Sequence, residues 1–165
     1  MKIQKISADK ILTLADHPQN NIVIVYDENG TILSIDNEKE HDPSSVRRLK
    51  GCIIPGFVNT HCHLELSHMK GLLDTGTGLL PFLQSVVKFR DFPEDVIMQA
   101  IKDADDYMYD NGIVAVGDIS NKTDTIKTKI ASKVNYYTFI EMFDFMQPFL
   151  YEQTCLLYTS DAADD

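Results

Sequence analysis

The sequence predicts an α/β protein in which a β-rich segment precedes alternating strands and helices. Short runs of β-branched residues separated by turn residues occupy residues 1–50. From residue 51, short apolar runs alternate with segments whose apolar residues recur at helical spacing. Three successive strand–helix steps favour an α/β barrel or a doubly wound sheet, because parallel strands need a crossover between them.

A β-hairpin is expected in the first segment. The apolar runs Asn21–Tyr26 and Thr31–Ile35 flank the dipeptide Asn29-Gly30. This dipeptide supplies the positive φ angles of a tight reversal. A further strand is expected over Lys10–Leu14, before the hairpin.

The strand–helix alternation follows a polar stretch, residues 37–50, that is expected to be a linker or an exposed loop. A buried strand is expected next, over Cys52–Asn59. Two later strands are expected, one over Ile113–Asp118, which should be fully buried, and one over Tyr136–Met142. Helices are expected over Leu79–Arg90, Pro93–Asn111 and Thr123–Ser132.

The clearest helix is the one over Pro93–Asn111. Proline suits the start of a helix and Gly112 suits the position after its end. One apolar stripe packs into the core, formed by Val96, Ile97, Ala100, Ile101, Ala104 and Met108. The outer acidic residues are expected to be solvated, namely Asp103, Asp105 and Asp106.

Composition argues against several classes of partner. Fifteen Lys and Arg against twenty-five Asp and Glu give a formal net charge of -10, which repels nucleic acid and anionic membrane surfaces. Three irregularly spaced cysteines form neither a disulfide framework nor a paired CxxC zinc site, so a reducing cytoplasm is expected. No secretory signal and no apolar run of roughly 20 residues is visible. Phosphate-binding GxGxxG and GxxxxGK[ST] motifs are also absent from the sequence.

Two histidines separated by one residue form the motif with the clearest chemistry. In a strand, side chains at i and i+2 share a face, so His61 and His63 present two imidazoles to one point while Cys62 faces away. Neutral imidazoles bind zinc at about 2.0–2.1 Å in catalytic sites that keep one position open for water. The alternative is a pair of exposed histidines in a loop that follows the strand.

The surrounding run, PGFVNTHCHLELSHMKG, resembles the first-strand signature of the amidohydrolase superfamily. It is most similar to the cytosine deaminase-like and chlorohydrolase-like branch, whose pattern is matched by Pro55, Gly56, Phe57, Val58, Asn59, His61 and His63. Asn111–Asp118 and Tyr137–Glu141 resemble the second and third strands of that family. The likeness extends over residues 3–153.

The resemblance implies the N-terminal part of a (β/α)8 TIM barrel preceded by a small β-sandwich segment. Residues 1–50 would form half of a composite sandwich, and residues 51–153 would form the first three strand–helix units. The last residues, 154–165, resemble translated sequencing adapter, with an ordinary acidic tail as the alternative. Without them the chain carries 15 basic and 22 acidic residues and stays acidic.

The resemblance also implies metal-dependent hydrolysis of a C–N bond. His61 and His63 would hold a divalent metal, zinc or iron, that generates hydroxide from bound water near neutral pH. The form His61–Ser67 is similar to members that deaminate purine-like substrates, including aminodeoxyfutalosine deaminases. The remaining ligands and the glutamate that shuttles protons are expected outside this chain. The fragment alone is therefore expected to be inactive, and its complete parent protein can be a homo-oligomer.

Two glutamates are candidates for substrate contact. Glu65 follows the histidine pair in a loop expected to overhang the barrel mouth, where an exposed carboxylate or a helix cap is the alternative. Glu141 ends a predicted strand on the side where barrel chemistry occurs. A strand-end cap is the alternative for Glu141 and the favoured role for Asp118.

Other polar residues near the motif have simpler interpretations. His68 is expected to be a surface residue or a group behind the ligands, and Cys62 a small buried hydrophobe. Thr75–Gly78 lacks the lysine and the preceding strand of a phosphate loop, and is expected to be a flexible loop near the active site.

Two further functions stay open. The same fold can hydrolyse an amide, a cyclic imide or a chlorinated heterocycle, and ammonia release would separate these from a deaminase. The third reading is a non-catalytic binding or assembly protein, since the later ligands are absent from the 165 residues.

Overall fold

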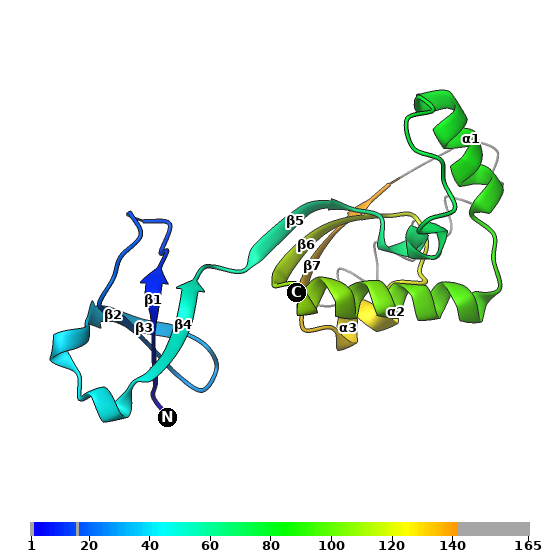
Figure 1. The fold of residues 1–165 in the computed structure, drawn as a ribbon. Coiled ribbons are helices and arrows are strands. Elements are labelled where there is room, and N and C mark those ends of the chain that lie inside the picture. Colours follow the sequence, from blue (N-terminus) through cyan, green and yellow to red (C-terminus); the bar gives the residue numbers. More distant parts are fainter. Residues whose placement is uncertain (1, 16, 142–165) are drawn as a thin grey trace. The chain divides into compact units, whose positions relative to one another are not determined.

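The computed structural model describes residues 2–15 and 17–141, which form two compact units. The chain divides between Pro55 and Gly56 (Figure 1). The tail over residues 154–165, predicted to be non-native, lies outside the described residues. None of the described helices is both long and apolar enough to cross a membrane.

The first unit is a four-stranded sheet in the order β3-β2-β1-β4. Its strands are β1 (Gln4–Ile11), β2 (Ile22–Tyr26), β3 (Ile32–Asn37) and β4 (Arg47–Ile53). β1 pairs antiparallel with β2 and parallel with β4, so the sheet is mixed. The buried residues Ala8, Ile11 and Ile22 form its small core. Its role as half of a sandwich stays a prediction.

The expected hairpin is confirmed, with β2 and β3 paired antiparallel. Of the predicted pair of positive φ angles, only Gly30 has one, at 86°. The turn is held by Asp27, whose Oδ1 accepts hydrogen bonds from the backbone N–H groups of Asn29 and Thr31, both at 2.9 Å. The Asp27 side chain therefore stabilises the reversal of the chain, and a second residue with a positive φ is not needed.

The sequence-based predictions for two elements in this region are wrong. The first strand begins at Gln4 and ends at Ile11, because Leu14 has a φ of 62° that strands do not accommodate. The stretch predicted as a linker contains two 3-10 turns, Glu38–Glu40 and Pro43–Ser45, and the beginning of β4. Asp42 caps the second turn by accepting from the Ser44 N–H, which lowers the pKa of the Asp42 carboxyl.

The buried strand predicted over Cys52–Asn59 is in fact two strands in two different sheets. Cys52 lies in β4, which ends at Ile53, and β5 begins at Phe57. Pro55 lies between them and lacks the N–H that a continuous ladder would need. Apolar character alone does not reveal this break, because the residues on both sides of Pro55 are apolar. Most of β5 is also exposed, contrary to the expected buried strand.

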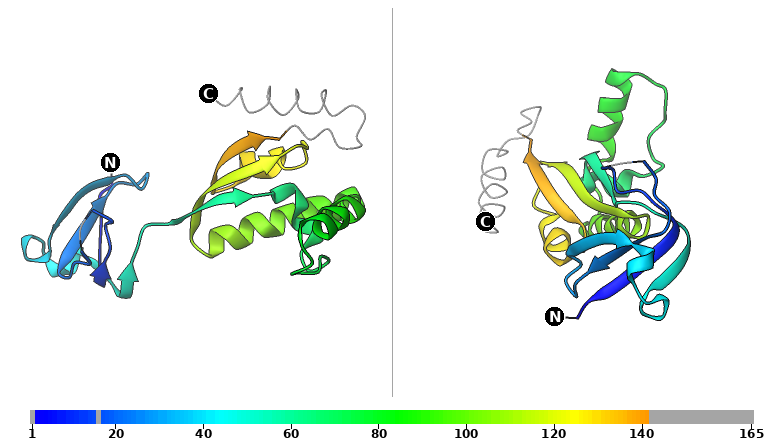
Figure 2. Two further views of the ribbon diagram at one scale, coloured as in Figure 1. Left: turned by 90° about the horizontal axis from the view of Figure 1, so that it is seen from above. Right: turned by 90° about the vertical axis from the view of Figure 1, so that its left-hand side faces the viewer.

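The second unit contains a parallel sheet in the order β5-β6-β7. Its strands are β5 (Phe57–Cys62), β6 (Ile113–Ser120) and β7 (Asn135–Ile140), with the 3-10 helix η3 (Leu64–Met69) and helices α1 (Leu79–Phe89), α2 (Glu94–Asp110) and α3 (Ile126–Ala131). In both views, α2 runs along one face of this sheet (Figures 1 and 2). The core between them contains Leu64, Ile97, Ile101, Met108, Val116 and Val134.

The predicted long helix is confirmed, with two corrections. Val96 was expected in the apolar stripe but is exposed in the first turn of α2, and one acidic residue is buried. Gly112, with a φ of 80°, ends the helix as expected. Asp103 and Asp106 are exposed, but Asp105 is buried and accepts hydrogen bonds from Ser132 Oγ and Tyr136 OH, each at 2.7 Å. Burial and this bond raise the pKa of the Tyr136 hydroxyl. Asp105 thus links α2 to β7 and is not part of a solvated face.

The strand predicted as fully buried, β6, is buried on one side only. Val116, Asp118 and Ser120 on one side are buried, whereas their neighbours on the other side are half-buried. Val114 shares the side of Val116 but is exposed at the beginning of the strand. Alternate residues of one strand face opposite sides of the sheet, and α2 covers one of these sides. The last strand ends at Ile140, and Met142 lies outside the described residues.

Candidate metal centre

The histidine pair lies at the C-terminal end of β5, where the strand contains a bulge. Asn59 pairs with Val116 and Cys62 with Asp118, so three steps along β5 match two along β6. Asn59 Nδ2 lies 3.9 Å from Met108 Sδ of α2, and Cys62 packs against the same core cluster. Two residues three positions apart thus face α2, which regular alternation would not allow.

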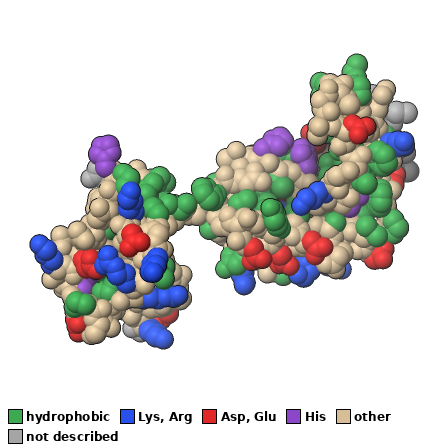
Figure 3. Space-filling model, in the orientation of Figure 1, with side chains coloured by type: hydrophobic (Ala, Val, Ile, Leu, Met, Phe, Trp, Pro, Cys, Tyr) green, Lys and Arg blue, Asp and Glu red, His purple; other side chains and the backbone are tan. Residues whose placement is uncertain are grey.

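The bulge leaves the two imidazoles together on the side away from Cys62. His61 is exposed and His63 is half-buried, and their ring centroids lie 5.2 Å apart. Figure 3 shows histidine side chains gathered on the surface of the second unit. Bulges are common beside active sites, and this one lies between Asn59 and Cys62, next to the histidine pair.

The distance between the rings fits two ligands of one metal ion. Two imidazoles bound to a tetrahedral ion at about 2.0–2.1 Å have ring centroids roughly 5 Å apart. Among the residues that the structure describes, no group of three or more His, Cys, Asp or Glu side chains could hold a metal. The described part of the chain therefore offers two ligands, and a complete catalytic site needs more.

The thiol between the histidines is a poor third ligand. Burial and the neighbouring Asp118 carboxylate raise the pKa of Cys62 to about 12. Metals bind the thiolate, which this environment disfavours. Cys62 instead contributes to the core, in agreement with its interpretation as a small hydrophobe.

Asp118 lies behind the ligand pair and is fully buried. Its Oδ1 accepts a hydrogen bond of 2.8 Å from the Leu64 N–H, immediately after His63. Its Oδ2 lies 2.8 Å from Lys129 Nζ of α3, which also donates to Thr138 Oγ1 of β7 at 2.7 Å. Asp118 thus connects the end of β5 to α3 and, through Lys129, to β7.

Glu65 is buried rather than overhanging the site as a free loop carboxylate, with 3% of its surface exposed. Its Oε2 accepts from Ser120 Oγ at 2.7 Å and from the N–H groups of Asn121 and Lys122 at 2.9 and 3.0 Å. Its Oε1 accepts from Arg90 Nη2 at 2.9 Å. These bonds join the segment after β5 to the segment after β6. A direct contact between Glu65 and substrate stays a prediction.

Glu141 follows β7 directly, and its side chain is exposed. Its N–H donates to Ser120 O at 3.0 Å, so it stands beside the end of β6. Because β5, β6 and β7 are parallel, their carboxyl ends meet at one edge of the sheet. Glu141 therefore lies at the same edge as the histidine pair, and its contact with substrate also stays a prediction.

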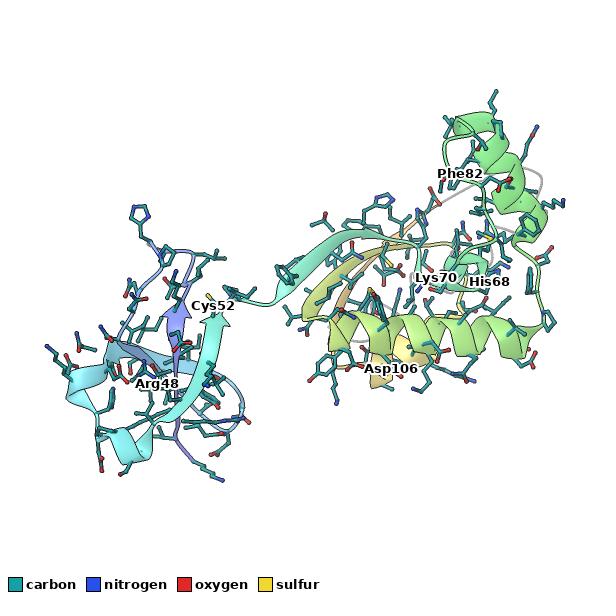
Figure 4. The ribbon with its side chains drawn as sticks, viewed as in Figure 1. Arg48, Cys52, His68, Lys70, Phe82 and Asp106 are labelled. Atoms are coloured by element: carbon teal, nitrogen blue, oxygen red, sulfur yellow. The ribbon has the colours of Figure 1, made fainter. Side chains whose placement is uncertain are left out.

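His68 and the Thr75–Gly78 loop lie farther along the chain. His68 Nε2 bonds Phe89 O at 3.2 Å, and its ring contacts Phe92 (Figure 4). The loop and the start of α1 line a cavity of about 490 Å³. The residues that line this cavity are Leu73–Leu79 and Phe82. They include none of the four predicted site residues, His61, His63, Glu65 and Glu141.

Two cations of the site were not singled out by the sequence. Arg90 and Lys129 neutralise Glu65 and Asp118 inside the fold. Arg90 is the only arginine after residue 48, and the guanidinium group suits buried ion pairs. A single arginine in the strand–helix part of the sequence could therefore have indicated a buried ion pair. Lys129 resembles any helical surface lysine in sequence, and only its position reveals its role.

Comparisons with solved structures show that several enzymes share the fold of this chain. No protein-family model matches the sequence, and no curated protein matches it significantly. Aminofutalosine deaminase from Helicobacter pylori, in complex with methylthio-coformycin, matches with a TM-score of 0.76 and 20% identity over 98% of this chain and 40% of that one. The chain therefore shares its fold with about two-fifths of this deaminase chain.

Two further structures agree with this fold. Guanine deaminase from C. acetobutylicum, with guanine in its active site, matches with a TM-score of 0.69 and 18% identity over 97% of this chain and 42% of that one. Atrazine chlorohydrolase TrzN from Arthrobacter aurescens, complexed with zinc, matches with a TM-score of 0.60 and 19% identity over 81% of this chain and 34% of that one. The chain spans about two-fifths of the length of the two deaminases. The predicted α/β class is confirmed.

Proposed function

We propose that this chain is the N-terminal part of a metal-dependent hydrolase of C–N bonds whose complete form deaminates an aminated purine-like or related heterocycle. The observation that carries the proposal is the pair of imidazoles, 5.2 Å apart, at the carboxyl edge of a parallel sheet. The likeness to aminofutalosine, guanine and adenosine deaminases supports the substrate class, with an aminodeoxyfutalosine-like substrate as one member.

In this proposal His61 and His63 hold a divalent metal, zinc by preference and iron as the alternative. Two similar structures contain bound zinc, which supports that preference. The bound metal supplies a water that is deprotonated near neutral pH. The further ligands and the group that moves the proton belong to parts of the complete protein beyond this chain.

The two glutamates have different roles in the proposal. Glu141 is exposed at the edge that carries the histidines, which supports a contact with substrate. The four partners of Glu65 support an orienting role, in which it holds the segment after β5 against the segment after β6. Any substrate contact of Glu65 would have to coexist with these bonds.

A hydrolase that releases a leaving group other than ammonia is the second candidate. The likeness to atrazine chlorohydrolase supports a chlorinated heterocycle, and the same site chemistry extends to amides and cyclic imides. The measured product separates these functions, since deamination releases ammonia whereas dechlorination releases chloride. A non-catalytic binding or assembly protein is the third candidate, because only two ligands occur among the described residues.

The test uses the complete protein that contains this chain, purified with its metal. We expect ammonia release from aminated purine nucleosides and stoichiometric zinc. His61→Ala and His63→Ala should each abolish turnover and reduce the zinc content. His41→Ala is the matched control, because His41 lies in the first unit and bonds Asp36 there. Unchanged zinc and turnover in the His61 and His63 variants would refute the proposal.

A further inference from the structure

We propose that Asp118 is a positioning residue that sets the direction of His63, an inference that rests on the metal-binding role of His63 proposed above. Asp118 does not share the face of the imidazoles. It acts through the backbone on either side of His63, and the contacts that support this are all buried.

The first of these contacts controls a backbone torsion of His63. His63 has φ of -125° and ψ of 76°, and this ψ lies outside the strand region. The ψ angle orients the peptide plane that contains the Leu64 N–H, and this N–H donates to Asp118 Oδ1 at 2.8 Å. Leu64 and Asp118 both have 0% exposure, so water does not compete for the bond. Asp118 therefore holds the turn that ends β5.

The residue before His63 is tied to the same place. Cys62 is paired with Asp118 across the two strands, directly after the β5 bulge. With Cys62 held by the ladder and Leu64 held by the Asp118 carboxylate, the Cα of His63 is fixed from both sides. The direction of its Cα–Cβ bond relative to His61 is thereby set, and this limits the positions that the imidazole can reach by rotation about χ1 and χ2.

The Asp118 carboxylate is itself held in place. Lys129 Nζ lies 2.8 Å from Oδ2, and the Lys129 side chain is 9% exposed. The same ammonium group donates to Thr138 Oγ1 of β7. Lys129 thus holds one carboxylate oxygen of Asp118 while the Leu64 N–H holds the other, and the partners behind a metal ligand affect metal affinity.

A purely structural role is the competing explanation, and two pairs of variants separate it from positioning. In Asp118→Asn with Lys129→Met, both charges are removed but the amide oxygen can still accept from the Leu64 N–H. In Asp118→Leu with Lys129→Met, the shape is retained and the acceptor is lost. Asp105→Leu is the control, because Asp105 is also a buried carboxylate, 6% exposed, and its hydrogen-bond partners are Ser132 and Tyr136 instead of the backbone next to His63.

The readout is zinc binding to this 165-residue chain, followed by NMR of 15N-labelled histidine rings. In the wild type, we expect the His61 and His63 signals to shift together on addition of Zn²⁺. We expect the asparagine pair to retain affinity within about threefold and the leucine pair to lose about tenfold or more. Asp105→Leu should lower the thermal midpoint while leaving the zinc affinity unchanged.

Each outcome decides between the two proposals. Absence of zinc-dependent shifts in the wild type overturns the metal assignment of the histidines and this inference with it. Wild-type binding combined with unchanged affinity in the leucine pair overturns this inference alone, as does an equal loss in Asp105→Leu. If the leucine pair does not fold, Asp118→Glu replaces it, since it keeps the charge and moves the acceptor by one methylene. An unaltered zinc affinity in Asp118→Glu would likewise overturn the positioning role of Asp118.

Discussion

Arg90 and Glu65 form a buried ion pair, with Arg90 Nη2 2.9 Å from Glu65 Oε1 and side-chain exposures of 8% and 1%. The two residues are 25 positions apart, and Arg90 follows the end of α1. The same guanidinium also bonds Asn121 Oδ1 after β6. Arg90 thus joins α1 to two segments at the carboxyl edge of the sheet.

Replacing Arg90 by methionine should strongly destabilise the second unit. Glu65 would remain buried without its cation, and breaking a buried pair in this way costs about 3–5 kcal/mol. Adding Glu65→Gln should recover part of the loss, because the neutral amide oxygen can still accept from the backbone. Chemical denaturation measures both changes. Lys102→Met, which removes an exposed pair with Asp106, is the control and should leave the midpoint unaltered.

Tyr136 should make stability sensitive to alkaline pH. Burial and the bond to Asp105 raise its pKa in the fold, whereas in the unfolded chain it loses its proton at about pH 10. The stabilisation is therefore complete below about pH 10 and declines as the pH rises further. Tyr136→Phe should cost about 1–3 kcal/mol at pH 8 and show a shallower decline above pH 10.

Urea unfolding between pH 8 and pH 11 measures this effect. Tyr137→Phe is the control, since Tyr137 is 70% exposed and adjacent in the same strand. Parallel pH profiles for the wild type and Tyr136→Phe would contradict the predicted linkage.

Gly56 should tolerate no side chain at the beginning of β5. A Cβ at this position would lie 2.8 Å from Val114 Cγ2 and 3.0 Å from its Cβ, closer than real contacts allow. Val114 is β-branched and has few alternative rotamers, so we expect Gly56→Ala to cost about 1–3 kcal/mol. The double variant with Val114→Ala should recover most of this loss. Equal stability of Gly56→Ala and the wild type in thermal unfolding would exclude the predicted clash.

The parallel sheet should make the 165-residue chain associate in solution. Among the described residues, β5 and β7 each pair only with β6, so both have an unpaired edge. Large apolar side chains on these strands are at least half exposed, namely Phe57, Val58, Tyr137 and Phe139. Unpaired edges and exposed apolar surface promote association. Light scattering should show a mass that rises with concentration, and a monomer that unfolds cooperatively at high temperature would contradict this prediction.

Elements governed by nearby residues were predictable. The hairpin follows from two β-branched runs around Asn29-Gly30, and the helix over Glu94–Asp110 follows from its apolar stripe, Pro93 and Gly112. The histidine pair was also visible in the sequence, because His61 and His63 are separated by a single residue. In each case the decisive residues lie within one element, where local backbone preferences and spacing operate.

Elements governed by distant residues were not predictable. The division of one apolar run into β4 and β5 depends on which sheet each part joins, and β4 pairs with β1 about 40 residues earlier. The burial of Asp105 depends on Ser132 and Tyr136. A buried aspartate and a solvated one are identical in sequence, and only the partner decides between them.

The sequence by itself determined that two histidines separated by one residue occur at the start of a strand–helix series. Together with the resemblance to the amidohydrolase superfamily, this was the basis for expecting a metal-dependent hydrolase. Tertiary structure alone decided how these imidazoles meet. The bulge in β5, the bond from Leu64 to Asp118 and the burial of Glu65 with Arg90 join residues 25 to 57 positions apart. Such contacts depend on the packing of strands and helices against each other, and local spacing contains no information about them.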